Sequence, residues 1–208
     1  MQTSAPLLGE PLPVELMNTI WADRDGVHDA LTEPAGTAAW LRAVAPRAEL
    51  LAAAGPEAPD EAELARLAER LRGLRNALRR LAAEATGDPR PAAAAPGEPA
   101  DLAAAVAAVN EAAGAVPRWS ALAWTPGETP ARLARTSGRA ADATVSAIAE
   151  EAVGLFSRPE RLRLRACLAP GCVLYFVKRH PRREWCSAAC GNRARAARHY
   201  DRHRRRAP

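Results

Sequence analysis

The chain has 208 residues, a quarter of them charged, and a formal net charge of +5. Residues 158–208 hold 15 Lys and Arg against 3 Asp and Glu, a net of +12, whereas residues 1–157 hold 14 against 21, a net of −7, and the two sum to +5. No stretch approaches 18 consecutive apolar residues, and the N-terminus lacks a basic segment followed by an apolar core. The sequence therefore excludes a membrane-spanning protein and predicts a cytoplasmic one, with a helical domain over 1–157 and a small basic module over 158–208.

The N-terminal domain is expected to be mainly helical, because its apolar residues recur at helical spacing. The clearest segment runs from Asp60 to about Ala85, where six leucines are spaced three or four residues apart. Too few heptads follow one another for a dimerisation zipper, so we interpret the leucine stripe as a face that packs on a core. Its opposite face is expected to lie in solvent and contains Arg66, Glu69, Arg70, Arg79 and Arg80. Four further helices are predicted: Val14 to Ala22, Pro34 to Val44 with Thr32 as N-cap, Asp101 to Ala113, and Pro130 to Phe156.

The β signal in this domain lies at residues 118–124, where large apolar and small residues alternate before a Pro-Gly pair. It predicts one short strand or half of a hairpin. Trp119 and Trp124 within it are candidates for a ligand pocket or for the core, and we favour the core because no acid, base or nucleophile accompanies them. Residues 86–100 contain four prolines among alanines and glycines and are predicted to form a surface loop.

Two polar residues, Asn18 and Thr19, interrupt the apolar face of the first predicted helix. They are candidates for a ligand site or for a structural polar site that fixes the path of a neighbouring loop. We favour the structural role, because buried polar groups are normally satisfied within the protein.

All four cysteines lie within 24 residues of the basic module, in a C-x4-C-x13-C-x3-C pattern formed by Cys167, Cys172, Cys186 and Cys190. Two close pairs joined by a ribbon are typical of a tetrathiolate site, and Zn²⁺ accepts four thiolates tetrahedrally. The alternatives are two disulfides or four unrelated thiols, which the clustering of the cysteines in a chain without a secretory signal disfavours. Because four thiolates leave no open position for a bound water, the pattern predicts one structural zinc ion. Residues 160–165 lead into Cys167 without a long linker, so we expect the module to pack rigidly on the domain.

A basic helix is predicted from its N-cap Ser187 to about Arg205. We expect Ala196, Ala197 and Tyr200 to form a small apolar face that docks on the zinc module, with Arg193 on the inner side. The opposite face and the loop between the cysteine pairs supply candidate nucleic-acid contacts: Arg195, Arg198, Arg202, Arg205, Lys178, Arg179, Arg182 and Arg183. Release of condensed counterions makes nucleic acid the favoured partner of such a segment. The alternatives are a solvated basic tail or one folded against the acidic domain.

The stretch Trp185-Cys186-Ser187, followed by Cys190-Gly191-Asn192-Arg193, resembles the signature of CGNR zinc fingers. The first knuckle, Cys167 to Cys172, and the segment Val173–Val177 extend this resemblance. These fingers lie at the C-terminus of a bacterial family described as stress-induced transcription regulators. Residues 15–21, 29–32 and 39–41 resemble the ABATE domain usually paired with the finger. The resemblance implies that the four cysteines bind zinc and that the module binds DNA.

No phosphate-binding glycine loop, HExxH motif or nucleophile elbow is present in the sequence, so no enzyme is predicted. His199 and His203 are spaced to chelate a second metal, but no third ligand follows, and we expect them to extend the basic face. Two functions remain: a transcription regulator that binds duplex DNA, and a zinc-stabilised module for an acidic protein or RNA. A homodimer or a partner is expected to be needed for specific DNA binding. The sequence names no small-molecule effector.

Overall fold

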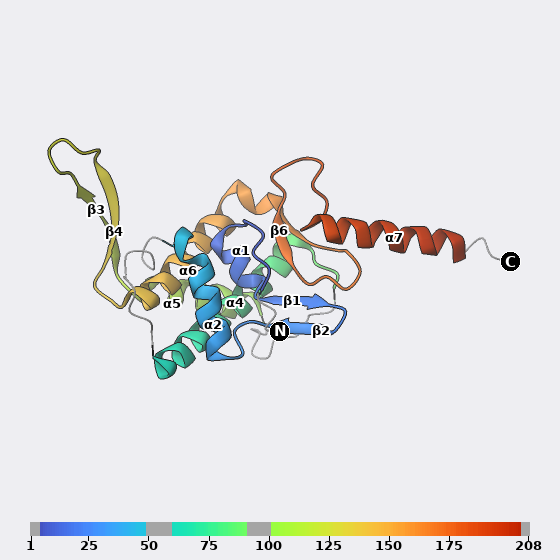
Figure 1. The fold of residues 1–208 in the computed structure, drawn as a ribbon, viewed down its shortest axis with the longest axis horizontal. Coiled ribbons are helices and arrows are strands. Elements are labelled where there is room, and N and C mark those ends of the chain that lie inside the picture. Colours follow the sequence, from blue (N-terminus) through green and yellow to red (C-terminus); the bar gives the residue numbers. More distant parts are fainter. Residues whose placement is uncertain (1–4, 49–59, 91–100, 205–208) are drawn as a thin grey trace.

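The computed structural model describes residues 5–48, 60–90 and 101–204, and its described part is mainly α-helical, as predicted (Figure 1). In chain order the elements are α1 (Leu12–Met17), β1 (Ile20–Asp23), β2 (Gly26–Asp29), α2 (Pro34–Val44), η1 (Ala45–Arg47), α4 (Glu61–Thr86), α5 (Leu102–Gly114), β3 (Arg118–Ala123), β4 (Ala131–Thr136), α6 (Ala140–Ser157), η2 (Pro159–Arg163), β5 (Leu164–Ala166), β6 (Tyr175–Val177) and α7 (Ala188–Arg204). No helix within the described ranges combines the length and the apolar character needed to cross a membrane.

Helix α4 is the element against which α1, α2, α5 and α6 pack. Asp60 accepts a hydrogen bond from the backbone N–H of Glu63 at 2.7 Å, and Gly87 ends the helix with a φ of 57°. A side-chain N-cap and a left-handed glycine therefore set its two ends, close to the predicted ones. The leucine stripe is confirmed as a core face, with its fully buried part formed by Leu67, Leu71, Leu74 and Leu78.

Two arginines of α4, Arg75 and Arg79, are buried. The prediction that Arg79 lies on a solvent face is therefore wrong. Arg79 is 5% exposed and donates to the carbonyl oxygens of Met17, at 3.0 Å, and Val173, at 3.3 Å. Arg75 is 1% exposed and pairs with Asp29 at 2.6 Å. Carbonyl and carboxylate acceptors replace the water that a guanidinium loses on burial. A pattern of polar and apolar residues cannot reveal such acceptors, since they come from distant segments.

The first helix is shorter than predicted, and a hairpin follows it. Helix α1 ends at Met17, and residues 20–22, which were predicted to be helical, belong to strand β1, which pairs antiparallel with β2. The turn includes Gly26 with a φ of 127°, a conformation that glycine adopts at little cost. At α2 the N-cap position belongs to Glu33, without a side-chain hydrogen bond, and not to Thr32.

The strand predicted at residues 118–124 is one half of a hairpin, in which β3 pairs antiparallel with β4. The helix predicted from Pro130 is therefore wrong over residues 131–136, and α6 begins only at Ala140. The hairpin projects from the helical body in Figure 1. Trp119 and Trp124 are 53% and 67% exposed, so the core role predicted for them is wrong.

The zinc module packs directly on the helical domain, as its short connection predicts. Strand β5 pairs antiparallel with β6, and both strands add residues to the main core. Leu164, Tyr175 and Val177 belong to the same buried cluster as the leucines of α4. Helix α7 then extends away from the body (Figure 1).

Candidate zinc centre and basic helix

The four cysteine sulfurs converge beside strands β5 and β6 and the start of α7. All four residues are buried and free of disulfides, and their Sγ atoms lie within 4.8 Å of one another. The Sγ–Sγ distances are 3.8 Å for Cys172–Cys186 and 3.4 Å for Cys186–Cys190. A tetrahedron with Zn–S bonds of about 2.3 Å places sulfurs about 3.8 Å apart, whereas a disulfide bond needs about 2.05 Å. The donor set fits one structural zinc ion, which confirms the predicted cofactor.

The protonation of this cluster explains why it needs a cation. Hydrogen bonds from the thiols of Cys172 and Cys186 lower the pKa of Cys167 to about 2. The hydrogen bond to Cys167 in turn raises the pKa of Cys172 to about 12, and hydrogen bonds to both neighbours, with burial, raise the pKa of Cys186. The thiols alone thus stabilise one thiolate by keeping others protonated. Zinc would displace those protons and neutralise the remaining charge.

Two short turns position the sulfurs. In the first, the backbone N–H of Cys172 donates to the carbonyl of Ala169 at 2.9 Å, and Gly171 has a φ of 72°. In the second, Ser187 Oγ accepts a hydrogen bond from the N–H of Cys190 at 3.2 Å. Ser187 therefore acts as the N-cap that the sequence predicts. The helix start and the second half of the zinc site are one structural unit.

The residues after Cys190 support the same unit. Gly191 lies so close to Trp185 that an added Cβ would be 3.1 Å from the indole Cδ1. Arg193 Nη2 donates to Cys190 Sγ at 3.2 Å. A guanidinium beside a thiolate ligand favours the ionised sulfur. Arg193 is exposed overall, but its guanidinium reaches back to the zinc site, in agreement with the inner position predicted for it.

A clamp from the loop after α4 holds the first knuckle. Arg90 Nη1 donates to three carbonyl oxygens of the knuckle, at 3.1 to 3.3 Å, those of Cys167, Cys172 and Leu174. Arg90 also pairs with Asp88 at 2.5 Å and lies over the ring of Tyr175, whose hydroxyl donates to Asp88 at 2.8 Å. Burial opposes the effect, but hydrogen bonds from Arg90 and Tyr175 lower the pKa of Asp88. Sequence analysis missed this clamp, because residues 86–100 show only a proline-rich loop composition.

Asn18 and Thr19 are fully buried, and both are hydrogen-bonded within the protein. Asn18 Nδ2 donates to the carbonyl of Tyr175, and Asn18 Oδ1 accepts from the N–H of the same residue, both at 2.9 Å. Thr19 Oγ1 donates to the carbonyl of Leu16 at 2.8 Å and accepts from Arg75 at 3.3 Å. The geometry supports the structural interpretation of this pair. Asn18 fixes strand β6 of the finger against the helical domain.

The basic loop between the cysteine pairs divides into inward and outward residues. The guanidinium of Arg183 donates to the carbonyls of Val177 and Cys186, at 3.1 and 2.9 Å, and pairs with Glu10 at 2.6 Å. Glu10 Oε2 also accepts from the N–H of Val177 at 3.0 Å. Arg183 thus holds the loop to the N-terminal segment. The other three predicted contacts lie nearer the surface: Arg179 and Arg182 are exposed, and Lys178 is half-buried.

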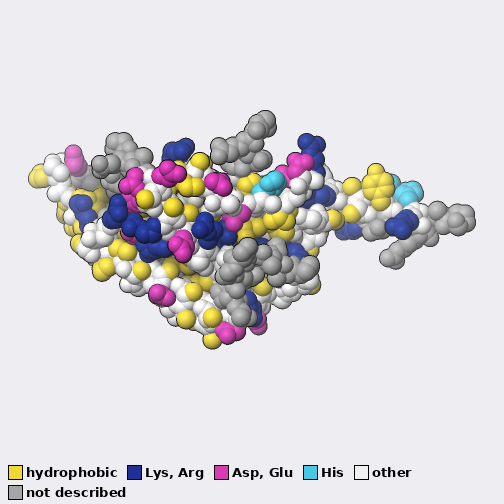
Figure 2. Space-filling view, turned by 90° about the horizontal axis from the view of Figure 1, so that it is seen from below, with side chains coloured by type: hydrophobic (Ala, Val, Ile, Leu, Met, Phe, Trp, Pro, Cys, Tyr) yellow, Lys and Arg dark blue, Asp and Glu magenta, His cyan; other side chains and the backbone are white. Residues whose placement is uncertain are grey.

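Helix α7 leaves the finger after its first turns. Ala194 is buried, whereas Ala196 is exposed and Tyr200 is 73% exposed, so the apolar face predicted to dock through Ala196, Ala197 and Tyr200 is wrong over most of its length. Arg195, Arg198 and Arg202 are exposed, and the predicted contact Arg205 lies outside the described residues. The space-filling view shows basic and histidine side chains on this extension (Figure 2).

The two histidines of α7 lie next to each other. The Nε2 atoms of His199 and His203 are 3.0 Å apart. No third His, Cys, Asp or Glu joins them within the part of the chain that the structure describes. The pair therefore adds to the polar surface of the helix.

Comparison with known families agrees with this geometry. Residues 10–159 match the ABATE family, described as a putative stress-induced transcription regulator. The chain belongs to this family. Residues 163–203 match the CGNR zinc finger, so the four-cysteine module is a CGNR finger and the family resemblance of the sequence is confirmed. The ABATE domain provides both Asn18 and Arg90, which hold that finger. No curated protein matches the chain.

Proposed function

We propose that this ABATE protein is a transcription regulator that binds duplex DNA through its CGNR finger. The zinc centre fixes the start of α7, and the exposed arginines of this helix, with Arg179 and Arg182 of the basic loop, contact the DNA. The observation that carries the proposal is the projection of α7 from the body (Figure 1). Its arginines Arg195, Arg198 and Arg202 make no ion pair with any side chain that the structure describes.

The dimensions of α7 suit the major groove. Its 17 residues give a length of about 25 Å, and the groove is about 12 Å wide and admits one helix. Phosphate contacts from the arginines would supply most of the affinity and its dependence on salt. Base-edge contacts from one or two of them would supply sequence preference. The buried apolar residues that anchor the first turns would keep the helix in a fixed orientation during binding.

The test is a titration of the zinc-loaded protein with duplex DNA at several salt concentrations. The double variant Arg198→Ala/Arg202→Ala should lower the slope of log K against log [salt] by about 2, or about 1 for each lost phosphate contact. The control Arg42→Ala/Arg135→Ala removes the same charge from exposed positions on α2 and β4. This control should leave the slope close to that of the parent protein.

Two outcomes would oppose the proposal. If the two double variants weaken DNA binding equally, only net charge matters, and α7 is not the contact surface. If single-stranded RNA or polyglutamate competes as well as duplex DNA at equal charge, the finger serves as a general module for acidic partners.

A further inference from the structure

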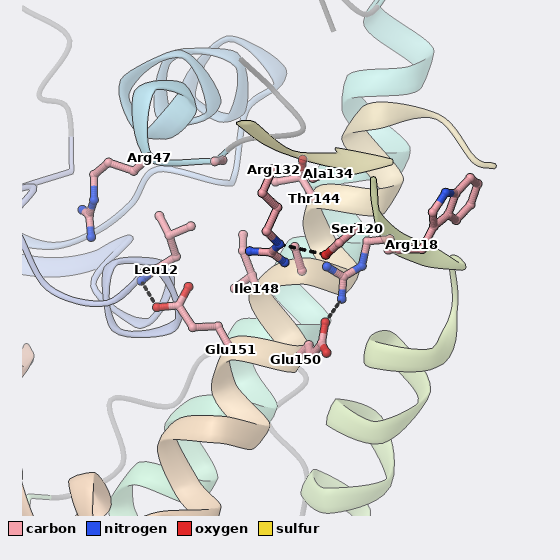
Figure 3. A pocket seen from close by; sticks show the side chains of 13 residues that line it. Leu12, Arg47, Arg118, Ser120, Arg132, Ala134, Thr144, Ile148, Glu150 and Glu151 are labelled. Atoms are coloured by element: carbon pink, nitrogen blue, oxygen red, sulfur yellow. Dashed lines mark hydrogen bonds and ion pairs between the residues drawn. The ribbon is translucent and has the colours of Figure 1, made fainter. Parts of the chain in front are cut away.

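A pocket of about 330 Å³ lies in the ABATE domain between helix α6, the β3–β4 hairpin and residues of α1 and η1 (Figure 3). Its volume falls at the lower end of the range for small-molecule sites, about 300–1,000 Å³. The apolar part of the lining comes from α1, α6 and the hairpin and includes Leu12, Ala147, Ile148 and Trp119. The contacts of the zinc finger with α4 do not use this pocket.

Three polar side chains enter the pocket from the hairpin. Arg118 and Ser120 alternate along β3 and therefore share one face of the sheet. Arg132 on β4 joins them, since its Nε donates to Ser120 Oγ at 2.8 Å. Figure 3 shows these side chains reaching toward helix α6. Two guanidinium groups and a hydroxyl are thus gathered at one wall.

The hydrogen-bonding capacity of this wall is not fully used. Arg132 makes no ion pair with a side chain in the described ranges. Arg118 pairs with Glu150, but its Nε is buried and has no hydrogen-bond acceptor among the described residues. A buried donor without an acceptor costs about 1–3 kcal/mol. The wall therefore lacks a negatively charged or strongly accepting group.

The two acids of the pocket do not fill that role. Glu150 is already bound to Arg118. Glu151 lies toward α1, where it accepts a hydrogen bond from the N–H of Leu12 at 3.3 Å. Burial raises the pKa of Glu151, because it disfavours the charged form.

We propose that this pocket binds a small organic anion that has one carboxylate and a compact apolar body. The carboxylate accepts hydrogen bonds from Arg132, whose planar guanidinium suits a two-oxygen group, and lies near the positive charge of Arg118. The apolar body lies against Ile148, Ala147 and Leu12. The occupant also contacts Leu12, two residues after Glu10, which is bound to Arg183 of the finger.

This binding goes beyond DNA recognition and is measured without DNA. The zinc-loaded full chain is mixed with benzoate, butyrate, neutral benzamide or inorganic phosphate, and its melting temperature is recorded. Benzoate or butyrate at about ten times its Kd should raise Tm by about 3–6 °C. Benzamide should have little effect, because it lacks the charge that Arg132 recognises. Isothermal titration calorimetry should give the Kd on which these concentrations are based.

Arg132→Ala should remove the carboxylate-induced rise, and Ser120→Ala should reduce it. Arg135→Ala is the matched control, because Arg135 is an exposed arginine of the same strand that does not line the pocket. The proposal is overturned if neither carboxylate raises Tm at any soluble concentration. It is equally overturned if the rise is the same in Arg132→Ala as in the parent protein. It is also overturned if benzamide acts as strongly as benzoate, or if phosphate alone stabilises the protein through Arg132.

Discussion

Replacing Asn18 by alanine tests how the ABATE domain holds its zinc finger. The change removes the two hydrogen bonds, both of 2.9 Å, that join the Asn18 amide to the backbone of Tyr175. Tyr175 is 3% exposed, so water has little access to the N–H and C=O left behind. Two backbone groups then remain buried without partners.

Each buried group without a partner costs about 1–3 kcal/mol, so the substitution should destabilise the protein by about 2–6 kcal/mol. In a chain of this size, 1 kcal/mol corresponds to about 2–4 °C in Tm. We therefore expect Tm to fall by at least about 4 °C. Because strand β6 directly follows the first zinc knuckle, zinc should also transfer faster to a chromophoric chelator.

Calorimetry and a chelator competition assay measure the two effects on the same preparation. The matched control is Asn110→Ala, since Asn110 is an exposed residue of helix α5 and should change stability by less than about 0.5 kcal/mol. The reasoning is refuted if Asn18→Ala resembles this control in both assays. A loss of stability without faster zinc release would limit Asn18 to a role in the core.

Three further outcomes are expected. Removing zinc should lower the Tm of the whole chain and not only unfold the finger, because Tyr175 lies in the main core. A thermal melting curve of the helical circular dichroism signal that is the same with and without chelator would contradict this. Arg183→Ala should lower the free energy of unfolding, measured by chemical denaturation, by about 3–5 kcal/mol, since it leaves the buried Glu10 unpaired. The control Arg182→Ala should change it by less than about 0.5 kcal/mol. Equal losses in the two variants would contradict a structural role for the Arg183–Glu10 pair. Burial raises the pKa of Glu151, so the stability due to its protonated form is present below the unfolded pKa of about 4.3 and is lost as pH rises through the folded value. Glu151→Gln should therefore be more stable than the parent protein at about pH 7, with the gap closing below about pH 4, and a less stable variant at neutral pH would refute this sign.

The long helices could be predicted from sequence because their signals are local. Asp60 and the leucine spacing define α4, and Asp101 caps α5 through the N–H of Ala104 at 2.7 Å. The two hairpins were harder, since strand pairing depends on partners elsewhere in the chain. The sequence shows no break between residues 131–136 and α6, so the predicted helix from Pro130 includes β4.

The zinc site was equally predictable, because four cysteines at short spacing determine both the ligand type and the geometry. The residues that hold the zinc site in place could not be predicted in the same way. Arg90 lies in a proline-rich loop, and Glu10 precedes the first helix. Both act through contacts with the finger 77 or more residues away along the chain. A single sequence contains no signal for contacts of that separation.

Charge counting treats all arginines of the basic module as equivalent, but the fold separates them by the acceptors they meet. The guanidinium of Arg183 binds carbonyl oxygens and a buried carboxylate, and that of Arg193 binds a zinc-ligating sulfur. Arg198 and Arg202 lie where the helix has already left the body, and Arg198 donates from Nε to the carbonyl of Ala194 in its own helix at 3.3 Å. Binding to a phosphate would cost Arg183 and Arg193 their internal hydrogen bonds, whereas Arg198 and Arg202 would give up mainly contacts with water. The net charge of the segment attracts a polyanion from a distance, but the arginines least engaged by internal acceptors determine where it docks.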